Sequence, residues 1–258
     1  MPLKHRLNSW IQRQRFLPSP LGVFVNRDFI IRRGLAREVE RFAMSCKGSV
    51  LDFGCGQQPY RELFEVQKYV GVDMAVSGHS SDKKHADVYL DSCALPFSDE
   101  AFEAALSTEV FQYVPDIPAA LGEISRVLKP GAPLLITYPF AYVETEMPYD
   151  LARYTSVGLD RYLEKAQFDV ERVVKMPSYV ETLTQLFTLF LSRTVLPWKR
   201  NSSRLISTAL VLAPINLLGI ALGRVLPNDT SYFHNCVIVA RKRKPSARAE
   251  QITPSADS

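Results

Sequence analysis

Residues 49–59 read SVLDFGCGQQP, a short and mostly apolar run followed by a loop with two glycines. The run over 49–53 predicts a buried strand that ends at Gly54. Pro59 suits the first turn of a helix, where its missing N–H leaves no bond unmade, and we expect that helix over 59–66. A strand that leads through a glycine-rich loop into a helix is typical of the ligand-binding turn of an open α/β sheet.

The same alternation of strands and helices continues along the chain. Short apolar runs predict strands over 69–73, 88–90, 102–107, 133–138, 168–175 and 235–241, and helical periodicity predicts helices over 27–44, 117–128 and 155–166. Strands that are apolar on both faces belong in a parallel sheet covered by helices. We therefore expect an α/β fold with a Rossmann-like, doubly wound sheet of seven strands, of which the last is antiparallel.

The composition agrees with a globular protein, but the charge is unevenly spread. Of the 258 residues, 47% are hydrophobic and 22% are charged, which excludes a disordered chain, a collagen and a coiled coil. The net charge of +4 separates into basic ends, over 1–49 and 241–258, and an acidic middle. Basic ends suit an anionic membrane surface or a phosphate-bearing substrate, and the alternative is solvated surface charge.

The cysteines and the N-terminal residues favour a reducing compartment. The four cysteines are Cys46, Cys55, Cys93 and Cys236. No two of them form a CxxC pair and no His lies at ligand spacing from any of them, so we expect neither a zinc site nor a disulfide framework. Charged residues interrupt the apolar ones over 4–15, unlike the apolar core of a signal peptide. The sequence therefore predicts a cytoplasmic protein without a bound metal.

The glycine loop suits a cation better than a dinucleotide. Gly54 and Gly56 match the first two glycines of the fingerprint GxGxxG, but its third position falls on Pro59, which disfavours a nicotinamide enzyme. Asp52 would sit poorly beside a diphosphate and well beside a positive charge. Asp73 ends the second strand, where a carboxylate commonly accepts both ribose hydroxyls. S-adenosylmethionine, a nucleoside with a sulfonium, an ammonium and no phosphate, meets both requirements.

Four segments in this order resemble the class I S-adenosylmethionine-dependent methyltransferases of the type 11 group: 50–56 (VLDFGCG), 69–73 (YVGVD), 91–114 and 124–140. The resemblance implies that the glycine loop lines the cofactor, that the end of the second strand holds the ribose, that the start of the third segment faces the adenine, and that two carboxylates lie near the methionine end. The implied residues are, in that order, Gly54, Cys55 and Gly56; Asp73 and Met74; Asp91 and Ser92; Asp52 and Glu109. The chain departs from the pattern at Tyr113, where the family often has His.

A further stretch, 147–173, resembles bacterial methyltransferases associated with cell-envelope glycan synthesis. It follows the fifth strand, so Tyr149, Asp150 and Arg153 are expected on the substrate side of the carboxyl edge of the sheet, as candidate catalytic residues. Asp150 could orient or deprotonate a substrate hydroxyl, and Arg153 could hold a phosphate or carboxylate. The alternative is an Asp150–Arg153 pair that only pins the start of a helix. Thr145 stands where His is common in that subgroup.

A long apolar segment separates the last two strands, where this fold usually has a short loop. The expected parts of the chain are a basic N-terminal arm (1–26), a methyltransferase domain (27–176 and 233–241), an apolar helical insertion (177–232) and a disordered basic tail (242–258). The run over 205–223 has no charged residue and almost spans a bilayer. This length predicts helical structure but leaves its surroundings open.

Three surroundings are compatible with this insertion. It could lie on a membrane through 179–226, with Trp198, Lys199 and Arg200 at the level of the lipid headgroups. It could pack as a helical cap on the domain or on a partner in a homodimer. It could also cross the membrane as a hairpin, although Glu181 and Arg193 weaken its first half. An exposed apolar surface of this size needs some partner in each case.

The sequence as a whole predicts S-adenosylmethionine-dependent methyl transfer by in-line displacement. The expected acceptor is a small molecule or a lipid-linked or cell-envelope glycan, reached from the inner face of the cytoplasmic membrane. The alternatives are a quinone or lipid methyltransferase and a non-catalytic methyltransferase-like binding or scaffold protein. Nucleic acid is not an expected partner, since no RNA-binding motif is visible. The scattered histidines are interpreted as ordinary residues, with His79 and His85 the closest to the ribose edge: His5, His79, His85 and His234.

Overall fold

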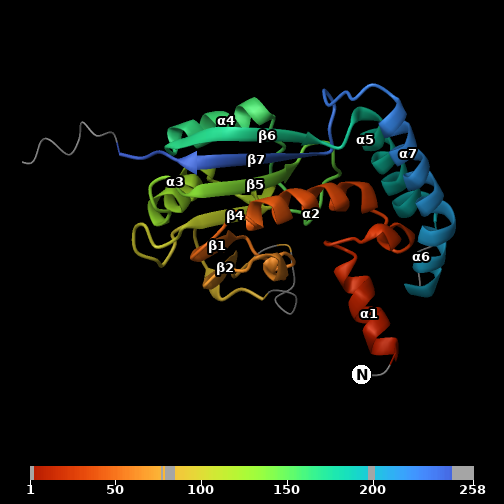
Figure 1. Ribbon diagram of the computed structural model, residues 1–258, viewed down its shortest axis with the longest axis horizontal. Helices are drawn as coiled ribbons and strands as arrows, with labels where there is room; N and C mark the ends of the chain where they lie inside the picture. The colour runs from red at the N-terminus through yellow and green to blue at the C-terminus, as the bar shows by residue number, and fades with distance from the viewer. Residues whose placement is uncertain (1–2, 77, 79–84, 197–200, 246–258) are drawn as a thin grey trace, which may run out of the picture.

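The computed structural model describes residues 3–76, 78, 85–196 and 201–245, and it contains one seven-stranded sheet (Figure 1). The strands lie in the order β3-β2-β1-β4-β5-β7-β6. Their bounds are β1 (Ser49–Phe53), β2 (Lys68–Met74), β3 (Val88–Leu90), β4 (Ala104–Thr108), β5 (Pro133–Pro139), β6 (Phe168–Met176) and β7 (Asn235–Lys242). Neighbours from β3 to β5 are parallel, whereas β7 is antiparallel to both β5 and β6. The predicted fold is confirmed.

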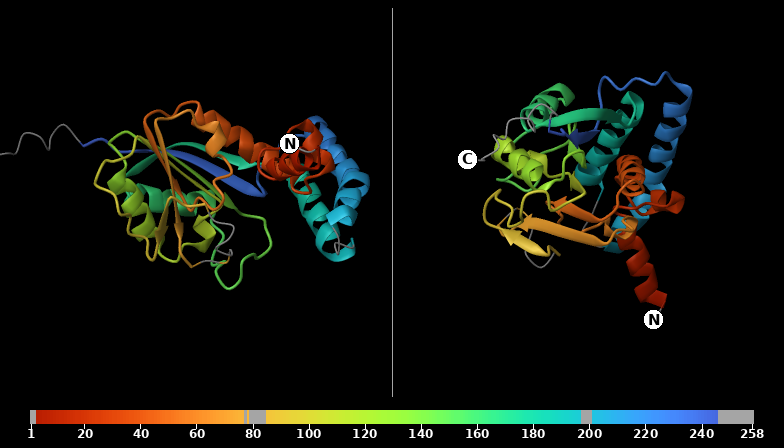
Figure 2. Two further views of the ribbon diagram at one scale, coloured as in Figure 1. Left: turned by 90° about the horizontal axis from the view of Figure 1, so that it is seen from below. Right: turned by 60° about the vertical axis from the view of Figure 1, so that its left-hand side comes forward.

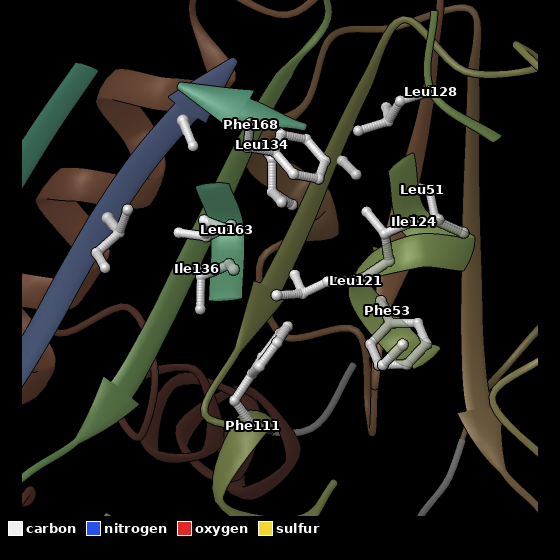
Figure 3. Close-up of a cluster of buried hydrophobic side chains, with 14 of the residues drawn as sticks. Leu51, Phe53, Phe111, Leu121, Ile124, Leu128, Leu134, Ile136, Leu163 and Phe168 are labelled. Carbon is white, nitrogen blue, oxygen red and sulfur yellow. The ribbon is translucent and has the colours of Figure 1, made fainter. Parts of the chain in front are cut away.

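Helices cover both faces of the sheet. Helices α3 (Ile117–Val127) and α4 (Ser156–Lys165) lie over one face, and α2 (Phe29–Ala43) lies over the other. Side chains alternate between the faces along each strand, so the neighbours Leu134 and Leu135 belong to different clusters. Figure 3 shows the cluster on the α3 face, where residues such as Leu121 and Ile136 meet. Burial on both faces explains why the strands are apolar throughout.

One predicted element near the N-terminus differs from the structure. The helix expected over 59–66 is absent, and only a 3₁₀ turn forms at Arg61–Leu63. Phe64 instead turns its ring toward Tyr69 and Phe42, at 5.3 and 6.5 Å between ring centroids. Two helical turns are too short to persist against such packing. The arm over 1–26 contains helix α1 (Leu3–Arg13) and a 3₁₀ turn at Pro20–Phe24.

The insertion is a helical hairpin. It comprises α5 (Tyr179–Phe190), a π-helical turn at Leu191–Val195, α6 (Asn201–Ser207), a second π-helical turn at Thr208–Leu212, and α7 (Ala213–Val225). Gly219 lets α5 and α7 approach closely, since a Cβ there would lie 2.4 Å from Cγ2 of Thr184. Trp198, Lys199, Arg200 and the tail beyond residue 245 lie outside the described residues.

The hairpin stands at the carboxyl edge of the sheet and packs on the domain (Figures 1 and 2). It leaves β6 and re-enters β7 at that edge because β7 runs antiparallel. Its inner side joins a buried cluster with α2 and the turn before it, composed of Val23, Phe29, Ile30, Ala213 and Ile220. The amide of Gln185 also donates to the carbonyl oxygen of Arg27 at 3.0 Å. The inner side of the hairpin therefore forms a helical cap on the domain.

The outer side of the hairpin remains apolar and exposed. Within the described residues, one helical stretch, Ser203–Val225, is long and apolar enough by composition to cross a membrane, and 33% of its most apolar window is buried. Leu210 and Val225 are 72% and 83% exposed. This surface is the part of the insertion that the domain does not cover.

Candidate functional site

The two glycines of the loop after β1 have different roles. Gly54 and Gly56 both have positive φ, at +74° and +52°, which side chains other than Gly rarely adopt. A Cβ on Gly54 would lie 2.3 Å from Cγ2 of Val110, so Gly54 is needed for packing against the segment after β4. A Cβ on Gly56 would meet nothing within 4 Å. Gly56 therefore leaves open space beside the backbone, into which a ligand could fit.

The end of β2 meets this loop. Asp73 accepts a hydrogen bond from the backbone N–H of Gly56 at 2.8 Å, which brings together two of the residues singled out in the sequence. Met74 beside it is half-buried. Asp91 and Ser92 follow β3 at the same edge and are exposed. The side chain of Cys55 is buried, so only its backbone reaches the outer surface of the loop.

Asp52 lies beneath the loop with one oxygen unpaired. The hydroxyl of Tyr69 donates to Oδ2 of Asp52 at 2.6 Å, and Oδ1 has no hydrogen-bond partner among the described residues. Burial, together with the nearby Asp73 and Asp87, raises the pKa of Asp52 to about 7. A buried carboxylate oxygen without a partner is a place for a positive charge, so the site fits a cationic ligand such as S-adenosylmethionine.

Glu109, just past the end of β4 (Ala104–Thr108), is fixed by its neighbours. Its backbone has a φ of +60°. Its Oε1 accepts hydrogen bonds from the hydroxyl of Thr137 at 2.9 Å and from the amide of Asn235 at 2.6 Å. These partners come from β5 and β7, so the Glu109 carboxylate joins three strands at the carboxyl edge of the sheet.

A small cavity of about 30 Å³ adjoins Glu109. Its lining residues are Asp28, Ile31, Arg32, Leu35, Glu109, Tyr142, His234 and Asn235. From the sequence, His234 was expected to be an ordinary residue, and Arg32 and Asn235 were not candidate site residues. The signal that could have found His234 and Asn235 is their position at the start of the last strand, which an antiparallel strand places at the carboxyl edge.

A larger cavity, of about 710 Å³, lies between the arm and the outer side of the glycine loop. It is lined by Ser9, Gln12, Arg13, Phe16, Leu17, Gln57, Gln58, Pro59, Arg61 and Glu62. Asp73, Asp91 and Glu109 are not part of this lining. The volume would suit a small molecule, but the three carboxylates expected to bind S-adenosylmethionine lie outside this cavity.

The residues expected on the substrate side form an ion pair. Both oxygens of Asp150 bind the guanidinium of Arg153, at 2.5 and 2.8 Å, and the backbone N–H of Thr145 also donates to Asp150 at 2.8 Å. The Arg153 guanidinium lowers the pKa of the Asp150 carboxyl, whose side chain is 1% exposed. Tyr149 next to it is exposed. A role of these three toward a substrate stays a prediction.

Tyr113 and Thr145, the two residues that depart from the family pattern, are in contact. The hydroxyls of Tyr113 and Thr145 lie 2.8 Å apart, and the Tyr113 hydroxyl also donates to Glu146 at 3.3 Å. The loop after β5 is thereby tied to the segment after β4. Tyr113 and Thr145 are distant in the sequence, and only the fold places them together.

Comparison with known proteins identifies the family of this chain. Residues 27–189 match the family described as methyltransferase domain. The chain is 33% identical over 94 residues to a malonyl-[acyl-carrier protein] O-methyltransferase of Erwinia pyrifoliae, covering 34% of this chain and 36% of that protein. It is 32% identical over 122 residues to a ubiquinone biosynthesis O-methyltransferase of Bradyrhizobium sp. (strain ORS 278), covering 42% of this chain and 47% of that protein. The chain thus spans less than half the length of these relatives.

A solved structure shares the fold. Phosphoethanolamine N-methyltransferase 2 of Haemonchus contortus, in complex with phosphomonomethylethanolamine and S-adenosylhomocysteine, superposes with a TM-score of 0.54 at 18% identity. The match covers 92% of this chain and 58% of that one. At this identity the likeness concerns the architecture alone.

Proposed function

The chain belongs to the methyltransferase domain family, and we propose that it transfers the methyl group of S-adenosylmethionine to an acceptor bound at the carboxyl edge of the sheet. The observation that carries the proposal is the hydrogen bond between Asp73 and the open glycine loop at Gly56. This bond brings the carboxylate that we propose for the ribose beside backbone that a ligand can approach. The unpaired oxygen of Asp52 supports a cationic ligand over a diphosphate.

Each residue of the proposed site has a role in binding S-adenosylmethionine. When bound, S-adenosylmethionine supplies a methyl group on a positively charged sulfur, already activated for attack. Asp73 would accept the ribose hydroxyls, Asp91 would face the adenine, and Asp52 would lie toward the positive charge. The hairpin and α2 would exclude water above the carboxyl edge. Alignment of the acceptor and exclusion of water are the main contributions that such a transfer needs from a protein.

The test is calorimetric titration of the full chain with S-adenosylmethionine and, separately, with NAD. We expect saturable binding of S-adenosylmethionine and none of NAD, because no third glycine makes room for a diphosphate. Tighter binding of NAD would replace the proposal by a nicotinamide function. Absence of binding by a folded sample would favour the non-catalytic scaffold.

Binding is also expected to release a proton at about pH 6, because Asp52, whose pKa lies at about 7, is then mostly protonated. A cation beside Asp52 favours the ionised form, so the bound state holds fewer protons. Titrations in two buffers of different ionisation enthalpy measure this release. The Asp52→Asn variant should show none, and equal release by both proteins would contradict the assignment.

The raised pKa of Asp52 also predicts how the stability of the folded chain changes with pH. Since burial raises the pKa of Asp52, the folded state favours its protonated form. This contribution is fully present below the unfolded pKa of about 4 and is lost as the pH rises through about 7. Without ligand, the wild-type chain should lose more stability than Asp52→Asn over this range.

For the acceptor we propose an oxygen nucleophile on a molecule with an apolar tail, presented at a membrane surface. The outer side of the hairpin is apolar, with Leu210 and Leu218 exposed. Basic side chains lie near the hairpin. Burial lowers the pKa of Arg15, and the nearby cations Arg204, on α6, and Arg32 lower it further, so these three cations lie close to one another. Helix α1 lies at the same end of the molecule as the hairpin (Figure 2). Apolar surface flanked by cations is complementary to an anionic bilayer.

The membrane contact is tested by sedimentation with vesicles. The full chain should bind vesicles containing phosphatidylglycerol more tightly than those of phosphatidylcholine alone. Leu210→Asp combined with Leu218→Asp should weaken binding about tenfold or more, since each leucine contributes about 1.5 kcal/mol or more when buried. The matched control is Val157→Asp, an equally exposed apolar residue on α4. A concentration-dependent dimer without vesicle binding would instead assign this surface to a second copy.

Two sources of such an acceptor share this chemistry. A lipid-linked glycan, which the resemblance over 147–173 implies, offers a sugar hydroxyl. A quinone precursor offers a phenolic hydroxyl, as in the ubiquinone pathway for which the Bradyrhizobium relative is named. Incubation with labelled S-adenosylmethionine and each class separately, in detergent, distinguishes them.

A further inference from the structure

A chain of hydrogen bonds fixes the orientation of the His234 ring. The carboxylate of Glu109 only accepts hydrogen bonds, so the group of Asn235 that faces it at 2.6 Å is the amide NH₂. The carbonyl oxygen of Asn235 is then the atom that lies 2.5 Å from Nδ1 of His234. Because that oxygen only accepts, Nδ1 must carry the proton. In the neutral ring, Nε2 is therefore left with a free lone pair.

That lone pair has no partner among the described residues. His234 is 3% exposed, and its Nε2 is buried without a hydrogen bond. His234 is one of the residues that line the cavity of about 30 Å³, a volume that holds roughly one water or one hydroxyl group. Burial of a basic nitrogen without a partner is unfavourable and is rare in folded proteins. A hydroxyl inserted into the cavity would satisfy it.

Charged groups from the neighbouring elements also face this cavity. Asp28 and Arg32 come from α2 and the residue before it, Glu109 follows β4, and Tyr142 follows β5. Burial lowers the pKa of His234, and Glu109 and Asp28 oppose this, so the ring is neutral near pH 7. The two carboxylates would stabilise the ring once it gained a proton, and Arg32 would stabilise an anionic oxygen in the cavity.

Glu109 links this cavity to the segment that packs against the glycine loop. Val110, the next residue, packs against Gly54 of the glycine loop. Glu109 itself lines the cavity and binds Asn235. Because Glu109 is expected at the methionine end of the cofactor, a group in the cavity would lie near the positive charge of the bound cofactor.

We propose that His234 is the general base of the reaction and that the acceptor is a hydroxyl group inserted into this cavity, which rests on the proposed methyl transfer. The acceptor O–H bond breaks and its proton moves to Nε2 of His234. The oxygen uses its lone pair to form the bond to the methyl carbon, and the electron pair of the broken carbon–sulfur bond stays on sulfur. The ring then loses its proton to solvent. The product is a methyl ether.

The first test does not depend on activity. Nitrogen NMR of the full chain labelled at histidine, with S-adenosylhomocysteine present, reports which ring nitrogen carries the proton. We expect Nδ1–H with an unprotonated Nε2 for His234 at pH 7. His234→Asn identifies the signal, and Asn235→Asp should alter it because the fixed acceptor is replaced. A proton on Nε2 at pH 7 would overturn the proposal.

The second test separates a base from a structural residue. His234→Asn can retain an N–H donor toward Asn235 but lacks Nε2 and Cε1, so it has no basic nitrogen. With a prenylated catechol as acceptor probe, kcat should fall about 100-fold or more, the usual contribution of a general base. With thiophenol, which ionises without help, the fall should be much smaller. Equal rates of wild type and variant with the catechol, or equal losses with both probes, would contradict the assignment.

Affinity for the cofactor distinguishes failure of this proposal from failure of the methyl-transfer function. His234→Asn should bind S-adenosylmethionine within about threefold of wild type, because His234 lies on the acceptor side. The matched control His5→Asn, at an exposed position on α1, should leave both affinity and rates unchanged. If the wild type does not bind S-adenosylmethionine, the methyl transfer itself is rejected. If only His234→Asn fails to bind it, only the role of His234 as a base is rejected.

Discussion

Replacement of Asp73 by Ala is expected to weaken binding of S-adenosylmethionine at least about 100-fold, or about 2.8 kcal/mol. A carboxylate that accepts both ribose hydroxyls makes two charge-assisted hydrogen bonds, each contributing about 1.5–3 kcal/mol. The substitution also removes the acceptor of the Gly56 N–H, which holds the glycine loop against β2. Calorimetric titration of the variant and the wild type measures the difference.

Two controls make this result specific. Asp160→Ala removes an exposed carboxylate on α4 and should leave the affinity unchanged. Asp73→Asn keeps one oxygen, which can accept the Gly56 N–H, and has an NH₂ group in place of the second, so its affinity should lie between those of wild type and Asp73→Ala. If Asp73→Ala were to bind as tightly as wild type while remaining folded, the ribose would have to lie elsewhere.

Replacement of Gly54 by Ala is expected to lower the free energy of unfolding by about 3 kcal/mol, which combines the strain of a left-handed backbone with overpacking. The new Cβ would lie 2.3 and 2.6 Å from the two methyl groups of Val110, and the backbone has a φ of +74°. For a chain of this size the midpoint of thermal unfolding should fall by roughly 10 °C. Differential scanning calorimetry without ligand measures it.

A second substitution and a neighbouring glycine test the cause. Val110→Ala in the Gly54→Ala background removes the clash and should recover part of the loss. Gly56→Ala creates no contact within 4 Å, so only its φ of +52° opposes it, and the loss should be about 1 kcal/mol. Its affinity for S-adenosylmethionine should nevertheless fall, because the methyl group fills the space left for the ligand. Equal loss of stability in Gly54→Ala and Gly56→Ala would contradict the packing argument.

Strong local patterns allowed most of the sheet to be predicted. The strands of the sheet are short apolar runs bounded by turn residues, and their observed bounds differ from the predicted ones by a residue or two. The helix over 59–66 was wrong because its pattern covers only two turns. There the rings of Phe64 and Tyr69 determine the conformation, and such contacts between segments leave no local periodicity.

The helices of the hairpin were also predicted from local patterns, but their packing was not. Its apolar runs predicted helices between the last two strands, and α5 and α7 lie there. Which side is buried depended on partners distant in the sequence, such as Arg27, whose carbonyl accepts from Gln185. Hydropathy alone is the same whether a helix faces a core, a second copy or a lipid surface.

The sequence by itself determined the sheet, the glycine loop and the carboxylate at the end of β2, because these depend on residue types at short spacings along one strand–turn–strand unit. Only the tertiary structure decided how the remaining polar groups are paired. It closed Asp150 onto Arg153, and it brought His234 and Asn235 to Glu109, more than a hundred residues earlier in the chain. The antiparallel course of β7 is the physical reason, since it returns the start of the last strand to the edge where the parallel strands end.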